Sequence, residues 1–276
     1  MKALPPSATT GERVTYVALR VFAAFVCLFL VTPIAAIVPL SFSSGSFLHY
    51  PLPGLSLRWY ADFFSSQFWL PSLWNSLFVG SISTVLAMVL GTMAAIGLWR
   101  TKFFGHRVAL AIIAAPMIVP EIIMAVGMYF AFAPLELTNA FSGIILAHTA
   151  LASPFVVITV LATLSGFDRT LIRAAANLGA NPVVAFFRVM LPLILPGIVS
   201  GGVFAFAVSF DEVIAVLILG GPGQRTLPRQ MFDGINDKIS LTITAAATLL
   251  IVTAVALMAC VEMLRRRSER LAGRRG

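Results

Sequence analysis

The chain has few charged residues. Of its 276 residues, 11% are charged, against about 25% in an ordinary soluble domain, whereas 59% are hydrophobic and the mean hydropathy is +0.96. A soluble fold could not bury so much apolar surface, so the composition argues strongly against a soluble enzyme and excludes a disordered or nucleic-acid-binding protein. The net charge of +8 does not change this, because basic charge in an apolar chain more often marks membrane orientation.

Several catalytic motifs are also absent. None of the three lysines, Lys2, Lys102 and Lys238, is followed by Ser or Thr, so the chain has no P-loop for a nucleotide. The three histidines are scattered without a His-Glu-x-x-His zinc motif, and no Gly-x-Ser-x-Gly elbow supports a Ser/His/Asp triad, although such a triad is not thereby excluded. These absences favour a transport role over catalysis.

Long apolar runs predict membrane spans, since about 20 apolar residues are needed to cross the hydrocarbon core of a bilayer. We expect six spans, at residues 21–40, 73–98, 108–132, 140–164, 191–219 and 241–264. The third, fourth and fifth contain Pro, Gly or acidic residues, which are tolerated where neighbouring helices or a polar cavity satisfy the groups they free.

The distribution of basic residues predicts the orientation. With the N-terminus inside, four of the 19 Lys and Arg residues fall outside, namely Arg58, Arg225, Arg229 and Lys238, and the other 15 fall inside. The positive-inside rule therefore predicts cytoplasmic termini: a tail at 1–20, a membrane domain at 21–264 and a basic tail at 265–276.

The N-terminus has a second interpretation, a secretory signal peptide. Its apolar region should be about 7–15 residues long, whereas the run that begins at Val21 continues past Val38, which favours an uncleaved span. Cys27 and Cys260 fall in the first and last spans without metal-like spacing, and we expect them to be small buried hydrophobic residues.

The segment 166–192, between the fourth and fifth spans, has the pattern of two helices with a sharp break. Asp168 can cap a helix start, after which apolar and polar residues fall on separate helical faces. Gly179 ends this helix, and Asn181 and Pro182 start a second one that runs towards the fifth span. Such a knob suits a binding partner, but a connector lying on the membrane surface fits the pattern equally well.

The same segment resembles the cytoplasmic signature of bacterial ABC importer permeases, which reads Glu-Ala-Ala, three residues, Gly, nine residues, Ile, one residue, Leu-Pro. The resemblance implies contact with an ATPase through Arg173, Ala174, Ala175, Leu178, Gly179, Val189, Leu191 and Pro192. Val189 replaces the usual Ile conservatively. Arg173 replaces the usual Glu, and this reversed charge suggests a compensating change in the partner.

A second set of motifs is similar to the spermidine/putrescine-type permease subfamily. The fifth span contains Ser209-Phe210-Asp211-Glu212, followed by Gly-Gly-Pro-Gly at 220–223 and Thr-Leu-Pro at 226–228. Asn-Ser-Leu at 75–77 and Pro-Glu at 120–121 fit the same subfamily. The resemblance covers residue 73 to the end of the sixth span and implies a polyamine or related small solute.

The resemblance implies an all-α, six-helix, MetI-like ABC importer permease fold and a role as one subunit of a larger machine. A second, related permease would complete the pathway, two ATPase subunits would bind the segment 166–192, and a periplasmic or lipid-tethered binding protein would deliver the solute. The chain itself would bind no cofactor, because ATP and Mg²⁺ would be held by the ATPase. The expected location is the bacterial inner membrane.

Acidic residues inside the spans are the candidates for the solute path. Glu121, Asp211 and Glu212 lie deep within spans, where an ionised acid costs about 2.5–3.5 kcal/mol, whereas Glu262 lies near a cytoplasmic end. The three deep acids would line a cation path, or they would cap broken helices and pair at the interface between permeases. Both alternatives stay open at this stage, with a structural role slightly favoured for Glu121 beside Pro120.

Three glycines in the fifth span predict close helix packing. Gly197 and Gly201 form a Gly-x-x-x-Gly step with Gly202 beside it, and small residues of this kind let helices approach closely in lipid. The alternative interpretation is local flexibility next to Pro196.

Two other functions compete with the importer permease. A gradient-driven secondary transporter of a small cationic solute would show inverted repeats, and no convincing repeat relates the two halves of the chain. An intramembrane enzyme would need a paired catalytic motif, and none is found in the sequence.

Overall fold

The computed structural model describes residues 9–101, 103–237 and 240–273, without the side chains of residues 12, 236, 237, 257, 260–262 and 264–273. Over these residues the chain is helical, and its only extended pairing is an isolated bridge between Ser43 and Leu55. The predicted all-α class is confirmed. The chain divides into two compact units, an N-terminal unit (Met1–Phe63 with Ile239–Leu249) and a core unit (Phe64–Lys238 with Leu250–Gly276).

The N-terminal unit contains the long helix α1 (Thr10–Leu40), most of α2 (Arg58–Ser65) and the first turns of α12 (Thr242–Gly273). Trp59 in α2 donates its indole N–H to the carbonyl of Ser43 over 2.8 Å. Trp59 also packs with Leu241 and Ala245, so a small apolar cluster holds this unit together.

Helix α1 starts earlier than the predicted span, because it already includes the second half of the predicted tail 1–20. The most hydrophobic part of its apolar stretch, Arg13–Leu40, contains no residue that is buried in the structure. Cys27 lies in this helix and is exposed, not buried as we expected; lipid or another chain would have to cover it. Cys260 lies outside the described side chains.

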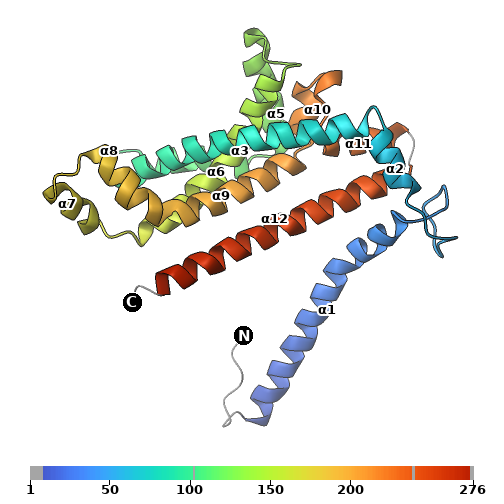
Figure 1. The fold of residues 1–276 in the computed structure, drawn as a ribbon, viewed down its shortest axis with the longest axis horizontal. Helices are drawn as coiled ribbons and strands as arrows, with labels where there is room; N and C mark the ends of the chain where they lie inside the picture. Colours follow the sequence, from blue (N-terminus) through green and yellow to red (C-terminus); the bar gives the residue numbers. More distant parts are fainter. Residues whose placement is uncertain (1–8, 102, 238–239, 274–276) are drawn as a thin grey trace. The chain divides into compact units, whose positions relative to one another are not determined.

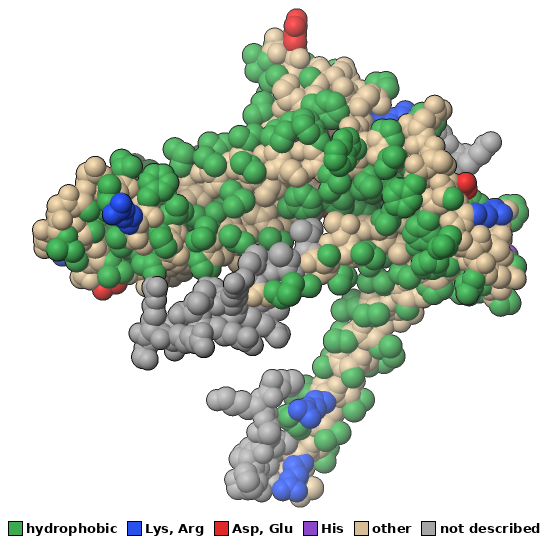
Figure 2. Space-filling view, in the orientation of Figure 1, with side chains coloured by type: hydrophobic (Ala, Val, Ile, Leu, Met, Phe, Trp, Pro, Cys, Tyr) green, Lys and Arg blue, Asp and Glu red, His purple; other side chains and the backbone are tan. Residues whose placement is uncertain are grey.

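The core unit is built on three helices, α3 (Trp69–Arg100), α6 (Phe141–Ser165) and α9 (Leu191–Asp211), which run side by side (Figure 1). Apolar side chains from all three form its main core, including Ala95, Val156, Val160 and Ile194. The exposed face of this unit is also largely hydrophobic, with few charged side chains (Figure 2), as expected of a surface that faces lipid.

Small residues allow the three helices to approach closely. A Cβ on Gly201 would lie 2.8 Å from Cα of Val156, and one on Gly202 would lie 2.5 Å from the sulfur of Met88. Gly197 faces Thr163 and the carbonyl of Thr159 on α6 in the same way. The predicted tight packing of the glycine step is therefore confirmed, and its neighbours are α6 and α3.

The third predicted span is not one continuous helix, which corrects our expectation for residues 108–132. The chain forms α4 (His106–Ala114), the 3₁₀ turn η1 (Ala115–Met117), α5 (Glu121–Phe132) and the 3₁₀ turn η2 (Ala133–Leu135). The two halves are bent by 105°. Pro116 and Pro120 explain the break, because proline lacks the amide hydrogen and disfavours helical geometry in the residue before it.

The fifth predicted span, 191–219, is also divided. Helix α9 ends at Asp211, and the short helix α10 (Ile214–Leu219) follows after Glu212 and Val213. Beyond it lie the 3₁₀ turn η4 (Pro222–Gln224) and α11 (Leu227–Asp237). Helix α10 packs against α5 through a second apolar cluster that includes Ala125 and Val216.

The predicted count of six spans stays a prediction. Among the described residues, four helical stretches are long and apolar enough to cross a membrane, and the bent pair would add a fifth. The apolar part of α12 whose side chains are described without a gap, Thr242–Ala256, is shorter. Helix α12 continues to Gly273, into the predicted basic tail 265–276.

Candidate coupling surface and solute path

The coupling region, residues 166–192, forms a knob at one end of the core unit (Figure 1). It consists of α7 (Thr170–Asn177), a turn, α8 (Pro182–Ala185) and the π-helical turn η3 (Phe186–Met190), which runs directly into α9. The two predicted helices and the continuation into the fifth span are confirmed. The π turn lies just before Pro192, whose missing amide hydrogen interrupts the regular helical ladder.

Local hydrogen bonds explain where the helices of the knob begin and end. The Asp168 carboxylate accepts the backbone N–H of Thr170 at 2.8 Å and the Thr170 hydroxyl at 2.6 Å. The Thr170 hydroxyl and then its amide hold the pKa of Asp168 below its usual range. Gly179 ends α7 with a φ of 82°, and the side chain of Asn181 accepts the N–H of Val184 at 2.8 Å to cap α8.

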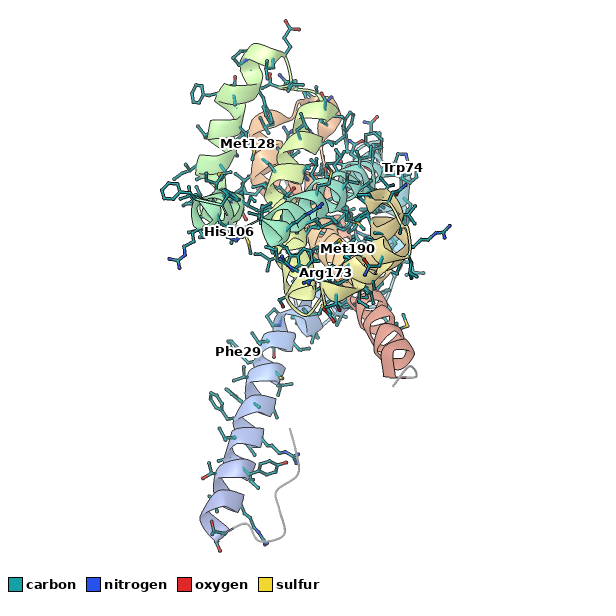
Figure 3. All side chains as sticks on the ribbon, turned by 90° about the vertical axis from the view of Figure 1, so that its left-hand side faces the viewer. Phe29, Trp74, His106, Met128, Arg173 and Met190 are labelled. Carbon is teal, nitrogen blue, oxygen red and sulfur yellow. The ribbon has the colours of Figure 1, made fainter. Side chains whose placement is uncertain are left out.

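The signature residues divide into an exposed group and a packed group. Arg173, Ala174, Leu178, Gly179 and Pro192 are exposed, whereas Ala175, Val189 and Leu191 are partly buried. Leu178 is 88% exposed, so its apolar side chain is fully available at the end of α7. Figure 3 looks onto this end of the core unit and shows Arg173 there. The exposed group therefore forms a surface of apolar and basic side chains that a partner protein could cover.

The three deep acids lie at the two helix breaks. Glu121 is the first residue of α5, Asp211 is the last residue of α9, and Glu212 precedes α10. Glu121 and Glu212 are close enough for their charges to interact, and α5 packs against α10. The fold thus brings together acids that are far apart in the sequence.

These acids differ in what they contact. Glu212 is buried, and its carboxylate accepts the N–H of Ala215 at 2.8 Å, so it caps the start of α10. Asp211 and Glu121 are exposed. No hydrogen bond or ion pair to the Asp211 side chain is found within the described part of the chain. Glu212 therefore has the contact that the structural alternative expects, whereas the carboxylates of Asp211 and Glu121 are exposed.

Ser209 has a defined partner on the neighbouring helix. Nδ1 of His148 on α6 lies 2.7 Å from Oγ of Ser209 on α9, and both residues are buried. This contact links the two helices two residues before the end of α9 at Asp211. The sequence did not identify His148, because the three histidines are far apart along the chain. The available signal was the presence of a polar residue within an apolar span.

The remaining motifs meet at the other end of α3. Asn75 donates its amide to the carbonyls of Gly223 and Arg225, at 3.1 and 2.9 Å. The hydroxyl of Ser76 accepts the N–H of Leu227 at 2.7 Å. The start of α3 therefore fixes the loop between α10 and α11, and the Asn-Ser-Leu and Thr-Leu-Pro motifs, far apart in the sequence, meet there.

Arg229 was not identified from the sequence as a structural residue. One nitrogen of its guanidinium donates to the carbonyls of Val216, Gly220 and Gly221, at 3.0, 2.9 and 3.2 Å. It thus satisfies carbonyl groups at the C-terminal end of α10, where a positive charge is favourable. Among the described residues, no three or more His, Cys, Asp or Glu side chains lie close enough together to hold a metal ion.

The apolar helices, two of them broken, and the exposed knob suit a subunit of a membrane transporter. The chain belongs to the family of binding-protein-dependent transport system inner membrane components, whose model matches residues 87–272. It is the permease component of an ABC importer, as the sequence motifs predicted.

Individual relatives agree with this assignment. The chain is 29% identical over 240 residues to the spermidine/putrescine transport system permease protein PotC of Haemophilus influenzae, covering 87% of this chain and 93% of the relative. It is 30% identical over 230 residues to the putrescine transport system permease protein PotI of Escherichia coli K12, covering 81% and 82%. A bacterial ABC transporter that imports the acidic polysaccharide alginate contains a chain of similar fold, with a TM-score of 0.74, 17% identity and 94% and 99% coverage.

Proposed function

We propose that this chain forms one half of a solute pathway that is driven by separate ATPase subunits. A second, related permease supplies the other half, and a periplasmic or lipid-tethered binding protein delivers the solute. The family's dependence on binding proteins and the missing P-loop support this division of labour. ATP and Mg²⁺ bind to the ATPase subunits, which dock on the coupling region through its exposed residues.

The proposed orientation places the coupling region and both termini in the cytoplasm of a bacterial cell. The excess of basic residues on that side supports it. Since Arg173 is exposed where the family usually has Glu, its docking partner on the ATPase would be acidic rather than basic.

The proposed solute is a polyamine such as spermidine or putrescine, or a related small cation. The observation that supports this most directly is Asp211, an exposed carboxylate at a helix break inside a membrane span, with Glu121 nearby. Two relatives that transport polyamines agree with it. A passing ammonium group would be attracted to Asp211 but not held tightly, because Glu212 is already occupied by the start of α10.

Uptake by the complete transporter in proteoliposomes tests this proposal. With spermidine-loaded binding protein outside and ATP inside, Asp211→Asn should lower the uptake rate about tenfold, which corresponds to about 1.4 kcal/mol. Glu136→Gln is the matched control, because Glu136 is an exposed acid outside both breaks and should leave uptake unchanged.

Two outcomes would contradict the proposal in different ways. If correctly inserted Asp211→Asn protein takes up solute at the wild-type rate, the proposed cation path is contradicted, but the permease assignment is not. Robust uptake by the lone chain in vesicles without ATP would instead support the gradient-driven alternative.

A further inference from the structure

Trp99, at the end of α3, contacts the start of the coupling region. It is followed only by Arg100 within that helix. The ring of Phe167 meets the Trp99 ring edge to face, with centroids 5.6 Å apart. The guanidinium carbon of Arg169 lies 4.3 Å from the centroid of the same indole, in a cation–π arrangement. Two residues of the link between α6 and α7 thus contact one aromatic side chain of α3.

Arg169 also makes a direct hydrogen bond to the backbone of α3. Its Nη2 donates to the carbonyl of Trp99 over 2.5 Å. The last carbonyls of a helix have no partner within the helix, and a cation at that end is favourable. Arg169 therefore binds α3 through its charge, its planar face and a hydrogen bond at the same place, a combination that lysine cannot reproduce.

The contact of Arg169 joins the knob to a helix that is not its neighbour along the chain. The knob is covalently joined to α6 through Gly166 and Phe167, and to α9 through η3. Helix α3 has no covalent connection to it. The neighbouring carboxylate of Asp168 bonds to Thr170, and no ion pair between Asp168 and Arg169 is found among the described residues. Without Arg169, the knob would keep only apolar contacts with α3, such as that of Phe167 with Trp99, and would lose its polar bond to the end of that helix.

We propose that Arg169 is a positioning residue, which fixes the knob to the end of α3 so that displacement of α7 moves α3, α6 and α9 as one body. The inference rests on the proposed docking of the ATPase on the coupling region. It predicts that breaking the contact uncouples ATP hydrolysis from transport, whereas a purely structural role would lower both activities in proportion.

The test measures uptake and ATP hydrolysis together in proteoliposomes that contain the complete transporter. Arg169→Ala and Trp99→Leu should each lower the number of solute molecules imported per ATP at least fivefold, while loaded binding protein still stimulates hydrolysis. Because both variants remove the cation–π contact, the double variant should lower the ratio by less than the product of the two single effects. Arg169→Lys should give an intermediate ratio.

Arg100→Ala is the matched control, because Arg100 is the adjacent exposed arginine at the same helix end. It should leave the ratio unchanged. If Arg169→Ala does not yield an intact complex, Trp99→Leu decides the question. A wild-type ratio in an intact variant complex, or a proportional loss of uptake and hydrolysis, would overturn the inference.

A separate arm distinguishes this failure from failure of the proposed docking. A cysteine at the exposed position 174 (Ala174→Cys) should crosslink to the ATPase in the assembled transporter. If no crosslink forms in the otherwise wild-type chain, the docking proposal fails, whatever import ratio Arg169→Ala gives. If the crosslink forms and the import ratio of Arg169→Ala is normal, only the positioning role fails.

Discussion

At the scale of single residues, a few polar side chains satisfy backbone groups of other segments. Asn75 and Ser76 bond to the loop before α11, and Arg229 bonds to the end of α10. Buried backbone groups without partners are costly in a membrane, so each of these side chains allows irregular backbone to exist there. The exposed residues of the knob differ, because their side chains point away from the fold.

Arg173 provides the prediction at this scale. If the native ATPase has an acid opposite it, Arg173→Glu should lower the ATPase recovered with the purified chain about fivefold, or about 1 kcal/mol, because like charges would then face each other. Arg173→Lys should retain most of the binding. The loss should diminish in high salt, since an exposed pair is screened.

Co-purification in mild detergent, with the ATPase quantified against the chain, measures this effect. Stronger recovery with Arg173→Glu than with the native chain would show that the partner has no compensating acid. The reversed charge at the start of the signature would then need another explanation.

At the scale of elements, local patterns predicted the coupling region well. Asp168, Gly179, Asn181 and Pro182 act on neighbours within a few residues, so their capping and turn roles follow from sequence alone. The spacing of Gly197 and Gly201 likewise predicted a close helix contact, because small residues on one face of a helix allow the backbone of a neighbouring helix to approach.

The broken helices could not be located in the same way. A continuous apolar run gives no periodic signal at the point where it bends, so residues 108–132 and 191–219 were each expected to form one span. The break after Asp211 is stabilised by Glu212 locally but by Arg229 from another helix, and the break before Glu121 is packed against α10. Such contacts depend on tertiary structure, which one sequence does not reveal.

Gly179 provides the prediction for the knob as an element. Its φ of 82° strains any residue with a side chain, by about 1–2 kcal/mol, although no atom lies within 4 Å of a Cβ built there. Gly179→Trp should reduce ATP-driven uptake below about a tenth while the chain still inserts, because the indole would project into the docking surface. Gly179→Asn should retain most uptake, because asparagine tolerates this conformation.

Uptake in proteoliposomes, normalised to inserted chain, is the measurement for both variants. Wild-type uptake by Gly179→Trp would show that the tip of the knob makes no contact needed for coupling. Equal loss in both variants would point to the turn geometry rather than to the surface.

At the scale of the whole molecule, the core unit has two ends with different chemistry. Asn75, near the start of α3, binds the loop at Gly223, whereas Trp99, near its end, contacts the knob. The 32 residues of α3 make a helix about 48 Å long, enough to cross a bilayer. The two ends should therefore lie on opposite sides of the membrane.

Cysteine labelling tests this arrangement and its direction. In a chain with Cys27→Ala and Cys260→Ala, we expect Gly223→Cys to react with a membrane-impermeant maleimide in intact spheroplasts. Ala174→Cys should react only after the membrane is opened, because the proposed orientation places it in the cytoplasm. Both positions are exposed, so accessibility within the fold does not bias the comparison. The reverse labelling pattern would invert the orientation.

Helix α10 has a consequence for how charge is distributed along the proposed path. A helix behaves as if it had about half a positive charge at its start and half a negative charge at its end. The carboxylate of Glu212 lies against the first end and the guanidinium of Arg229 against the second. The two side chains thus oppose the charges at the two ends of α10, and a cation arriving at the break would meet the exposed carboxylates of Asp211 and Glu121.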